Sequence, residues 1–228
     1  MARPRYPRDE GPLPPPLPPA TRTVGQLVAE SVRFYGAHFW RSLTLGVAPG
    51  IVGVVLATLP GWWRTAFILT GGALLLTLAY AAACALALGA ELRTRAAVVA
   101  VAAGTLAFVP FPFLGSVFVL PGVAWLAFVG LVVPVALVER LGFRASFARA
   151  IALARADYVH ALGSLSALVV TSVLTATVLF FLLRGQGDAA LSVAAFVALL
   201  VISPVVLLGS ALLYVDQAAR VRSSRRGR

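Results

Sequence analysis

Long apolar runs dominate the chain. Windows without an acidic residue or an arginine cover residues 42–63, 65–90, 96–138, 158–183 and 189–215. A helix needs about 20 apolar residues to cross roughly 30 Å of membrane hydrocarbon, so four windows predict one span each. Window 96–138 would form a helix of about 65 Å, which is enough for two spans. The pattern therefore predicts an all-α membrane protein with six transmembrane helices.

The long window offers two places to turn. A break at Pro110 and Pro112 leaves only about 21 Å of helix before it, whereas Pro121-Gly122 is a strong turn dipeptide and lets Pro121 open the next helix. We predict the turn at Pro121 and Gly122, with the earlier prolines kinking the span. The expected spans are residues 42–60, 65–90, 96–119, 121–138, 160–183 and 189–215.

Two further segments have an amphipathic helical pattern. In residues 23–39, Gln26, Glu30 and Arg33 fall on the face opposite Leu27 and Val28, and Thr23 with Gln26 matches a capping box. Residues 143–158 repeat the pattern. Such helices bind anionic lipid surfaces or act as elbows that set the angle of the next span, and the pattern fits both. We predict two cytoplasmic amphipathic interfacial helices in addition to the six spans.

The distribution of charge supports this count. Hydrophobic residues make up 60% of the chain, charged residues 12%, and every basic residue is arginine. Six spans put 17 of the 19 arginines on one side, with Arg64 and Arg184 on the other; a single crossing at 96–138 would give nine against ten. Arginine-rich short loops stay cytoplasmic, which predicts both termini inside. The same rule accounts for the net charge of +11, so we expect no nucleic-acid partner.

Composition also suggests the source and the domain organisation. The lack of lysine and the abundance of Ala, Val and Gly suggest a GC-rich bacterial genome, hence a bacterial cytoplasmic membrane. Residues 1–22 are rich in proline and predict a disordered tail; a docking ligand for an aromatic groove is the less favoured alternative. The membrane domain is expected at 23–218 and a basic cytoplasmic tail at 219–228.

Few residues inside the spans could carry chemistry. No Asp, Glu or Arg falls within them, which weakens a transporter interpretation. The lone Cys84 allows no disulfide within the chain, and His38 and His160 lack partners at ligand spacing, so we expect no metal and no cofactor. Gly46 and Gly50 are four apart and favour close helix packing over substrate contact.

Acidic residues stand at the expected cytoplasmic ends of three spans. We predict that they form a structural layer with nearby arginines, although ordinary solvated helix ends are an alternative for each acid alone. The members of this charge layer are Glu91, Glu139, Asp216, Arg41, Arg149 and Arg155.

Several passages together resemble a known family. They are Thr23-Val-Gly-Gln26, Phe34-Tyr35, Phe39-Trp40, Pro121-Gly122, Val133-Pro-Val-Ala-Leu-Val-Glu139, Phe147-Ala-Arg-Ala-Ile-Ala-Leu-Ala-Arg155 and Leu213-Tyr-Val-Asp216. The chain resembles the membrane domain associated with bacterial glycerophosphoryl diester phosphodiesterases. That resemblance implies a six-span membrane module without the catalytic barrel.

Together these patterns predict a non-catalytic integral membrane protein that acts as an anchor, scaffold or accessory subunit. A transport component for a lipid or another amphiphile is the alternative. The expected partners are the lipid bilayer, including anionic lipids of the inner leaflet, and an unknown membrane protein. A wide, partly polar cavity at Pro49, Pro110, Pro112 and Pro204 would favour transport, and a tightly packed interior would favour the scaffold.

Overall fold

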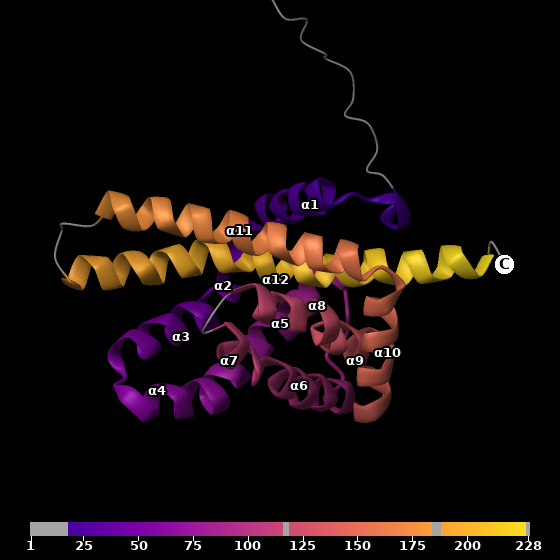
Figure 1. Ribbon diagram of the computed structural model, residues 1–228, viewed down its shortest axis with the longest axis horizontal. Coiled ribbons are helices and arrows are strands. Elements are labelled where there is room, and N and C mark those ends of the chain that lie inside the picture. The colour runs from indigo at the N-terminus through magenta and orange to yellow at the C-terminus, as the bar shows by residue number, and fades with distance from the viewer. Residues whose placement is uncertain (1–17, 116–118, 184–187, 227–228) are drawn as a thin grey trace, which may run out of the picture.

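A computed structural model describes residues 18–115, 119–183 and 188–226. All its regular elements are helical (Figure 1). They are η1 (Pro19–Thr21), α1 (Val24–Ala37), α2 (Phe39–Leu45), α3 (Val47–Thr58), α4 (Gly61–Phe67), η2 (Ile68–Gly72), α5 (Ala73–Leu88), α6 (Thr94–Phe108), α7 (Phe111–Gly115), α8 (Val119–Val129), α9 (Val132–Val138), α10 (Phe143–Ala156), α11 (Tyr158–Leu183) and α12 (Asp188–Arg226).

Six helical segments among the described residues are long and apolar enough to cross a membrane. Several combine two consecutive helices, such as α2 with α3 and α8 with α9. The segments are Phe39–Thr58, Gly61–Leu88, Thr94–Leu114, Val119–Val138, Tyr158–Val178 and Val193–Ser224. The expected number of long apolar helices is therefore confirmed, and the architecture fits a multi-pass membrane protein.

The predicted turn at Pro121 and Gly122 is wrong. Both residues lie inside α8, which already begins at Val119. Proline is tolerated there because the first backbone N–H groups of a helix have no helical acceptor, so the missing donor costs little. The expected interruption near Pro110 is present, since α6 ends at Phe108 and α7 begins at Phe111.

The last helix is the longest element and organises the bundle. Its 39 residues correspond to about 58 Å, and α11 packs beside it along the long axis of the molecule (Figure 1). Pro204 lies inside α12 without interrupting it. Because α12 continues to Arg226, residues 219–226 extend this helix and are not a separate tail.

The first amphipathic helix begins as predicted. Thr23 accepts a hydrogen bond from the Gln26 backbone, and the Gln26 side chain accepts one from the Thr23 backbone, which completes the capping box. Leu27 and Ser31 are buried, and α1 packs along α12 and α11 (Figure 1). Helix α1 thus runs beside α12 and does not lie across the bundle. The two helices approach closely because Gly209 of α12 has no side chain and leaves room for Ser31.

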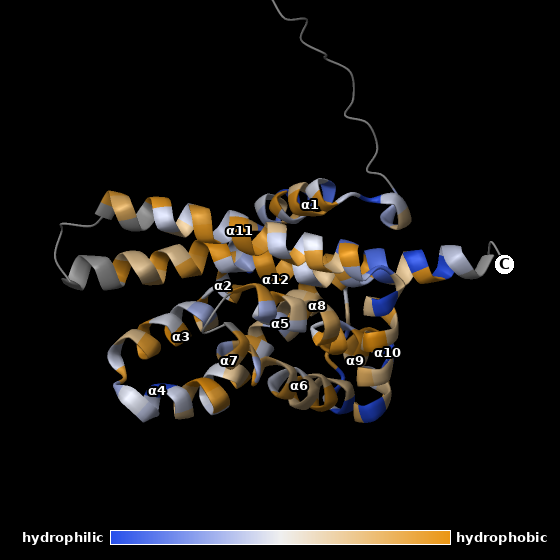
Figure 2. Cartoon of the chain, viewed as in Figure 1, coloured by the Kyte–Doolittle hydropathy of each residue, from blue (hydrophilic) through white to orange (hydrophobic). Residues whose placement is uncertain are grey.

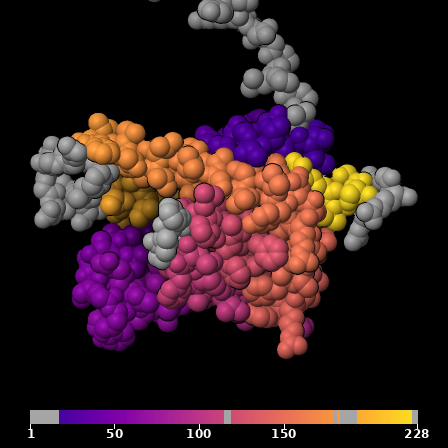
Figure 3. Space-filling model, in the orientation of Figure 1, coloured from indigo at the N-terminus to yellow at the C-terminus, as the bar shows by residue number. Residues whose placement is uncertain are grey.

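The ends of the molecule differ in polarity. Figure 2 shows hydrophilic segments gathered around α10, the beginning of α11 and the last turns of α12. Helix α10 is drawn across the direction of α11 and α12, and it packs against α8, α9 and α12. In the space-filling view, α10 and α11 form a continuous surface beside α8 (Figure 3). At the opposite end, Trp62 and Trp63 are exposed and stacked at 3.9 Å.

The amino-terminal boundary also differs from the expectation. Residues 18–22 belong to the packed structure, because η1 lies against α12 and Arg22 is mostly buried. The rest of the proline-rich segment, residues 1–17, lies outside the described residues.

Candidate functional site

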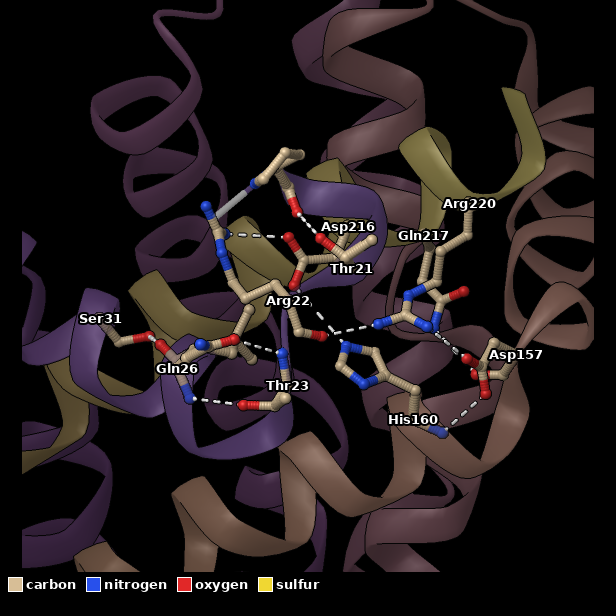
Figure 4. A network of polar contacts seen from close by, with 12 residues as sticks. Thr21, Arg22, Thr23, Gln26, Ser31, Asp157, His160, Asp216, Gln217 and Arg220 are labelled. Atoms are coloured by element: carbon tan, nitrogen blue, oxygen red, sulfur yellow. Dashed lines mark hydrogen bonds and ion pairs between the residues drawn. The ribbon is translucent and has the colours of Figure 1, made fainter. Parts of the chain in front are cut away.

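A buried ion pair joins the first packed residues to the last helix. The Arg22 Nη1 atom lies 2.9 Å from Asp216 Oδ1, and the Asp216 side chain is 0% exposed (Figure 4). Arg22 is extended just before the Thr23 cap, which directs its side chain toward α12. A charge at this depth is stable only when it is paired. The pair therefore fixes η1 and the start of α1 against α12.

Arg220 connects this pair to the start of α11. Its Nη2 donates to the Arg22 backbone carbonyl at 2.7 Å, and its Nη1 lies 2.7 Å from Asp157 Oδ2. Asp157 Oδ1 also accepts a hydrogen bond from the His160 backbone N–H at 3.0 Å, as a helix-capping side chain does. Gln217 donates from Nε2 to the Asp157 carbonyl. These contacts join η1, α11 and α12 at one point.

Several buried atoms in this polar cluster have no hydrogen-bond partner among the described residues. They are Asp216 Oδ2, His160 Nε2, Gln217 Oε1, Arg220 Nε and, nearby, Ser164 Oγ. The first two lie 3.6 Å apart. Buried polar atoms are normally hydrogen-bonded, often to ordered water. Donors and acceptors of this kind could hold water and exchange a proton between His160 and Asp216.

The cluster is poorly suited to a metal ion. Two carboxylates and two guanidinium groups balance each other, and each carboxylate already faces an arginine. Within the described residues no group of three or more potential metal ligands comes together. The arrangement therefore serves pairing within the protein better than capture of a cation.

A second, smaller cluster joins α9, α10 and α12. Arg149 Nε lies 2.9 Å from Glu139 Oε2, and the Tyr214 hydroxyl donates to Glu139 Oε1 at 3.2 Å. Glu139 follows the last turn of α9, where a carboxylate opposes the helix dipole. Arg149 and Tyr214 compensate that unfavourable charge.

The other residues of the predicted charge layer are separate from these clusters. Glu91 contacts Arg93 and Arg140 in an exposed group. Arg155 lies over the Phe128 ring at 5.8 Å, and Arg41 belongs to no ion pair in the described part of the chain. The six predicted residues thus do not form one connected network: Glu139 pairs with Arg149, whereas Asp216, Glu91 and Arg155 have partners outside the predicted set.

Sequence reasoning missed Arg22, the ion-pair partner of Asp216, and Arg220, which bonds to Arg22 and Asp157. The predicted boundaries place both arginines in tails outside the membrane domain. No local spacing relates residues that lie 194 positions apart. An acidic residue directly before an apolar run is a recognisable capping signal, so the position of Asp157 could have been found.

The paired glycines do serve packing. A Cβ at Gly46 would collide with the Leu200 backbone carbonyl, and one at Gly50 would lie 2.7 Å from Phe196 Cε2. Both contacts bring α3 against α12. Leu200 is also the residue whose helical hydrogen bond Pro204 removes, since proline has no N–H to donate four residues later.

An apolar cavity of about 380 Å³ lies between the α11–α12 pair and helices α3, α5, α6, α7 and α8. Pro49 is the only one of the four prolines considered above that appears among its described lining residues. The cavity is wide, as expected for transport, but its lining is almost wholly apolar. The transport expectation is therefore met in volume but not in polarity, and the tightly packed interior expected for a scaffold is not found around this cavity.

Comparison with known proteins identifies no relative. No family model matches the chain, and no curated protein or solved structure matches it significantly.

Proposed function

We propose that this chain is a non-catalytic, multi-pass protein of a bacterial cytoplasmic membrane that acts as an anchor, scaffold or accessory subunit. Both termini lie in the cytoplasm, and α10 is a cytoplasmic amphipathic helix. Helix α1 starts on the same side and runs beside α12. The resemblance to the phosphodiesterase-associated membrane domain supports this assignment, since that domain accompanies a catalytic barrel without being one.

The orientation is supported by the two ends of the bundle. Helix α10 carries Arg144, Arg149 and Arg155, and the last turns of α12 carry Arg220 and Arg222, as expected for a cytoplasmic side. The opposite end carries the exposed Trp62–Trp63 pair, and tryptophan is enriched where a span leaves the hydrocarbon. Anionic lipids of the inner leaflet bind at this arginine-rich end.

The observation that carries the scaffold role is the internal use of the charged groups. Asp216, Asp157 and Glu139 each bind an arginine from another segment of the chain. These pairs stabilise a defined arrangement of η1, α9, α10, α11 and α12. A rigid cytoplasmic end of this kind is suited to hold a partner membrane protein.

Two experiments test this proposal. Single cysteines are placed at Arg93, Ala148 or Trp63 in a Cys84→Ala background. Cysteines at the Arg93 and Ala148 positions should be labelled from the cytoplasmic side, and a cysteine at the Trp63 position from the outside. Labelling of the Arg93 position from outside would refute the orientation. Gentle solubilisation of native membranes should also recover one protein partner in fixed stoichiometry; hydrolysis of a phosphodiester by the purified chain, abolished by Asp216→Asn, would refute the non-catalytic role.

A second candidate function is favoured by the apolar cavity. Its volume falls within the range of about 300–1,000 Å³ that is typical of ligand sites. A transport component for a lipid or another amphiphile would need such a space within the membrane layer.

A further inference from the structure

We propose that the apolar cavity binds one acyl chain of a membrane phospholipid, which enters with its terminal methyl group first. The inference rests on the membrane location proposed above and is independent of the scaffold role. Four features support this occupant: the length of the cavity, its buried end, its open end and the absence of charged residues from its described lining.

The cavity is elongated along α11 and α12. On α12 its lining extends from Ala198 to Leu213, which corresponds to about 22 Å of helix. The acyl layer of one leaflet is about 15 Å thick, half of the hydrocarbon core. The cavity is therefore long enough for a whole acyl chain that lies roughly parallel to the two helices.

Part of the cavity is shielded from the surroundings. Leu213, at the end of the α12 lining opposite Ala198, is only 1% exposed, and Leu131 and Tyr80, which also line the cavity, are 2% and 3% exposed. Their side chains come from α12, the start of α9 and α5, so three separate segments shield this part of the cavity. A ligand that reaches them is separated from the surrounding lipid.

The other end is open. Val173 of α11 lines it and is 53% exposed. A second cavity of about 320 Å³ shares Val173, Ala176, Ala198 and Leu199 with the first and extends it between α11 and α12. Both cavities lie within segments apolar enough to cross a membrane, so the medium at this opening is lipid.

The described lining offers no charged partner to a ligand, and its polar side-chain groups are the hydroxyls of Tyr80, Ser172, Ser203 and Ser210. No Asp, Glu, Arg or His is among the described lining residues. The hydroxyls of Ser203 and Ser210 are already bonded to the carbonyls of Leu199 and Val206 in their own helix. A carboxylate or phosphate inside would remain unpaired, which is costly in an apolar site. The occupant is thus pure hydrocarbon, and its head group stays outside the opening.

A phospholipid is the source that matches this arrangement. The opening faces the lipid layer on the side of Trp62 and Trp63, because α3 runs antiparallel to α12 and ends near those residues. Phospholipid acyl chains are the hydrocarbon present there at the highest concentration. A free fatty acid of the same chain length is the competing source, and the experiment below separates the two.

The test uses the full chain in vesicles of phosphatidylethanolamine and phosphatidylglycerol. A fraction of the phospholipid carries a diazirine at the terminal carbon of one acyl chain. After irradiation, we expect adducts on Leu213, Leu131 or Tyr80, which surrounding lipid does not reach. Mass spectrometry of the intact protein after extensive detergent washing should show one retained phospholipid per chain.

Two substitutions should fill the cavity. Ala176→Phe narrows the opening and Ser203→Phe occupies the middle, and each should abolish the adducts on the buried lining residues. Val170→Phe on α11 and Val201→Phe on α12 are matched controls, since these exposed positions do not line the cavity. The controls should retain the adducts. Thermal unfolding and gel filtration verify that every variant is folded.

The possible outcomes are distinct. Absence of adducts on the buried lining residues of the natural chain, their persistence in both filled variants, or retention of a free fatty acid in place of a phospholipid would each refute the proposal. Failure of the protein to float with vesicles would instead refute the membrane location on which it rests.

Discussion

Gly46 lies against the backbone carbonyl of Leu200, the acceptor that Pro204 deprives of its helical hydrogen bond. Leu200 and Pro204 are on α12, whereas Gly46 separates α2 from α3. The lack of a side chain at Gly46 lets the first candidate span approach this carbonyl directly. Close contact of this kind between small residues is a principal source of stability where both helices are surrounded by lipid.

Gly46→Ala should therefore destabilise the protein. The added methyl group would collide with backbone, which cannot rotate away as a side chain can. Overpacking of this type costs about 1–3 kcal/mol. Thermal unfolding in detergent measures the effect. Gly36→Ala is the matched control, because nothing lies within 4 Å of its added Cβ, and it should be neutral or slightly stabilising. Equal melting temperatures for both variants would contradict the packing role.

The Arg22–Asp216 pair should be strongly coupled. Arg22→Gln leaves a fully buried carboxylate without its guanidinium and should cost about 3–5 kcal/mol. Asp216→Asn removes the charge that Arg22 compensates, so the double variant should be less destabilised than the sum of the single variants. Unfolding free energies of the four proteins test this. Strict additivity would show that the two side chains contribute separately.

Glu139 should couple to Arg149 and not to Arg155. Glu139 accepts a hydrogen bond from Arg149, whereas Arg155 lies over Phe128. The cycle of Glu139→Gln and Arg149→Gln should give a coupling energy of about 1 kcal/mol, measured by unfolding. The cycle with Arg155→Gln supplies the control and should be additive. A larger coupling with Arg155 would contradict this arrangement, because it would mean that α10 turns Arg155 toward Glu139 in place of Arg149.

Tyr35→Phe should stabilise the protein. The Tyr35 hydroxyl is buried without a hydrogen-bond partner among the described residues, and such a group costs about 1–3 kcal/mol. Desolvation by burial also raises the pKa of Tyr35 above its ordinary value of 10.0.

The pH dependence of this variant has a defined sign. Because the pKa of Tyr35 is higher in the folded protein than in the unfolded chain, ionisation of the phenol destabilises the fold. The free energy of unfolding is therefore unaffected by this ionisation below pH 10.0 and falls as the pH rises through the folded-state pKa. The advantage of Tyr35→Phe in melting temperature should thus grow above pH 10. A constant difference across that range would show that the phenol reaches solvent.

The elements of this fold are readable from the sequence because each depends on local information. Hydrophobic length identifies the spans, and the Thr23–Gln26 box is contained within four residues. The predicted turn at Pro121-Gly122 is wrong because a proline near the start of a helix and a proline in a turn give the same local pattern. Only the position of Val119 within the helix distinguishes them.

The site depends on distant contacts, and these leave no periodic pattern. Glu139 and Arg149 are ten residues apart on consecutive helices, and this contact could be anticipated. Arg22 and Asp216 are 194 residues apart. The orientation of α1 along α12 depends in addition on the space that Gly209 leaves for Ser31, which no pattern within α1 contains.

The distance between Arg22 and Asp216 also has a consequence for biosynthesis. Ribosomes add about 5–20 residues per second, so roughly 10–40 s separate the synthesis of these two residues. During that interval the buried face of α1, including Leu27, has no α12 to cover it. The apolar side of α1 must meanwhile rest on lipid or on a chaperone. The bundle closes only when its final helix has been made, so a chain truncated before Asp216 exposes its own beginning to quality control.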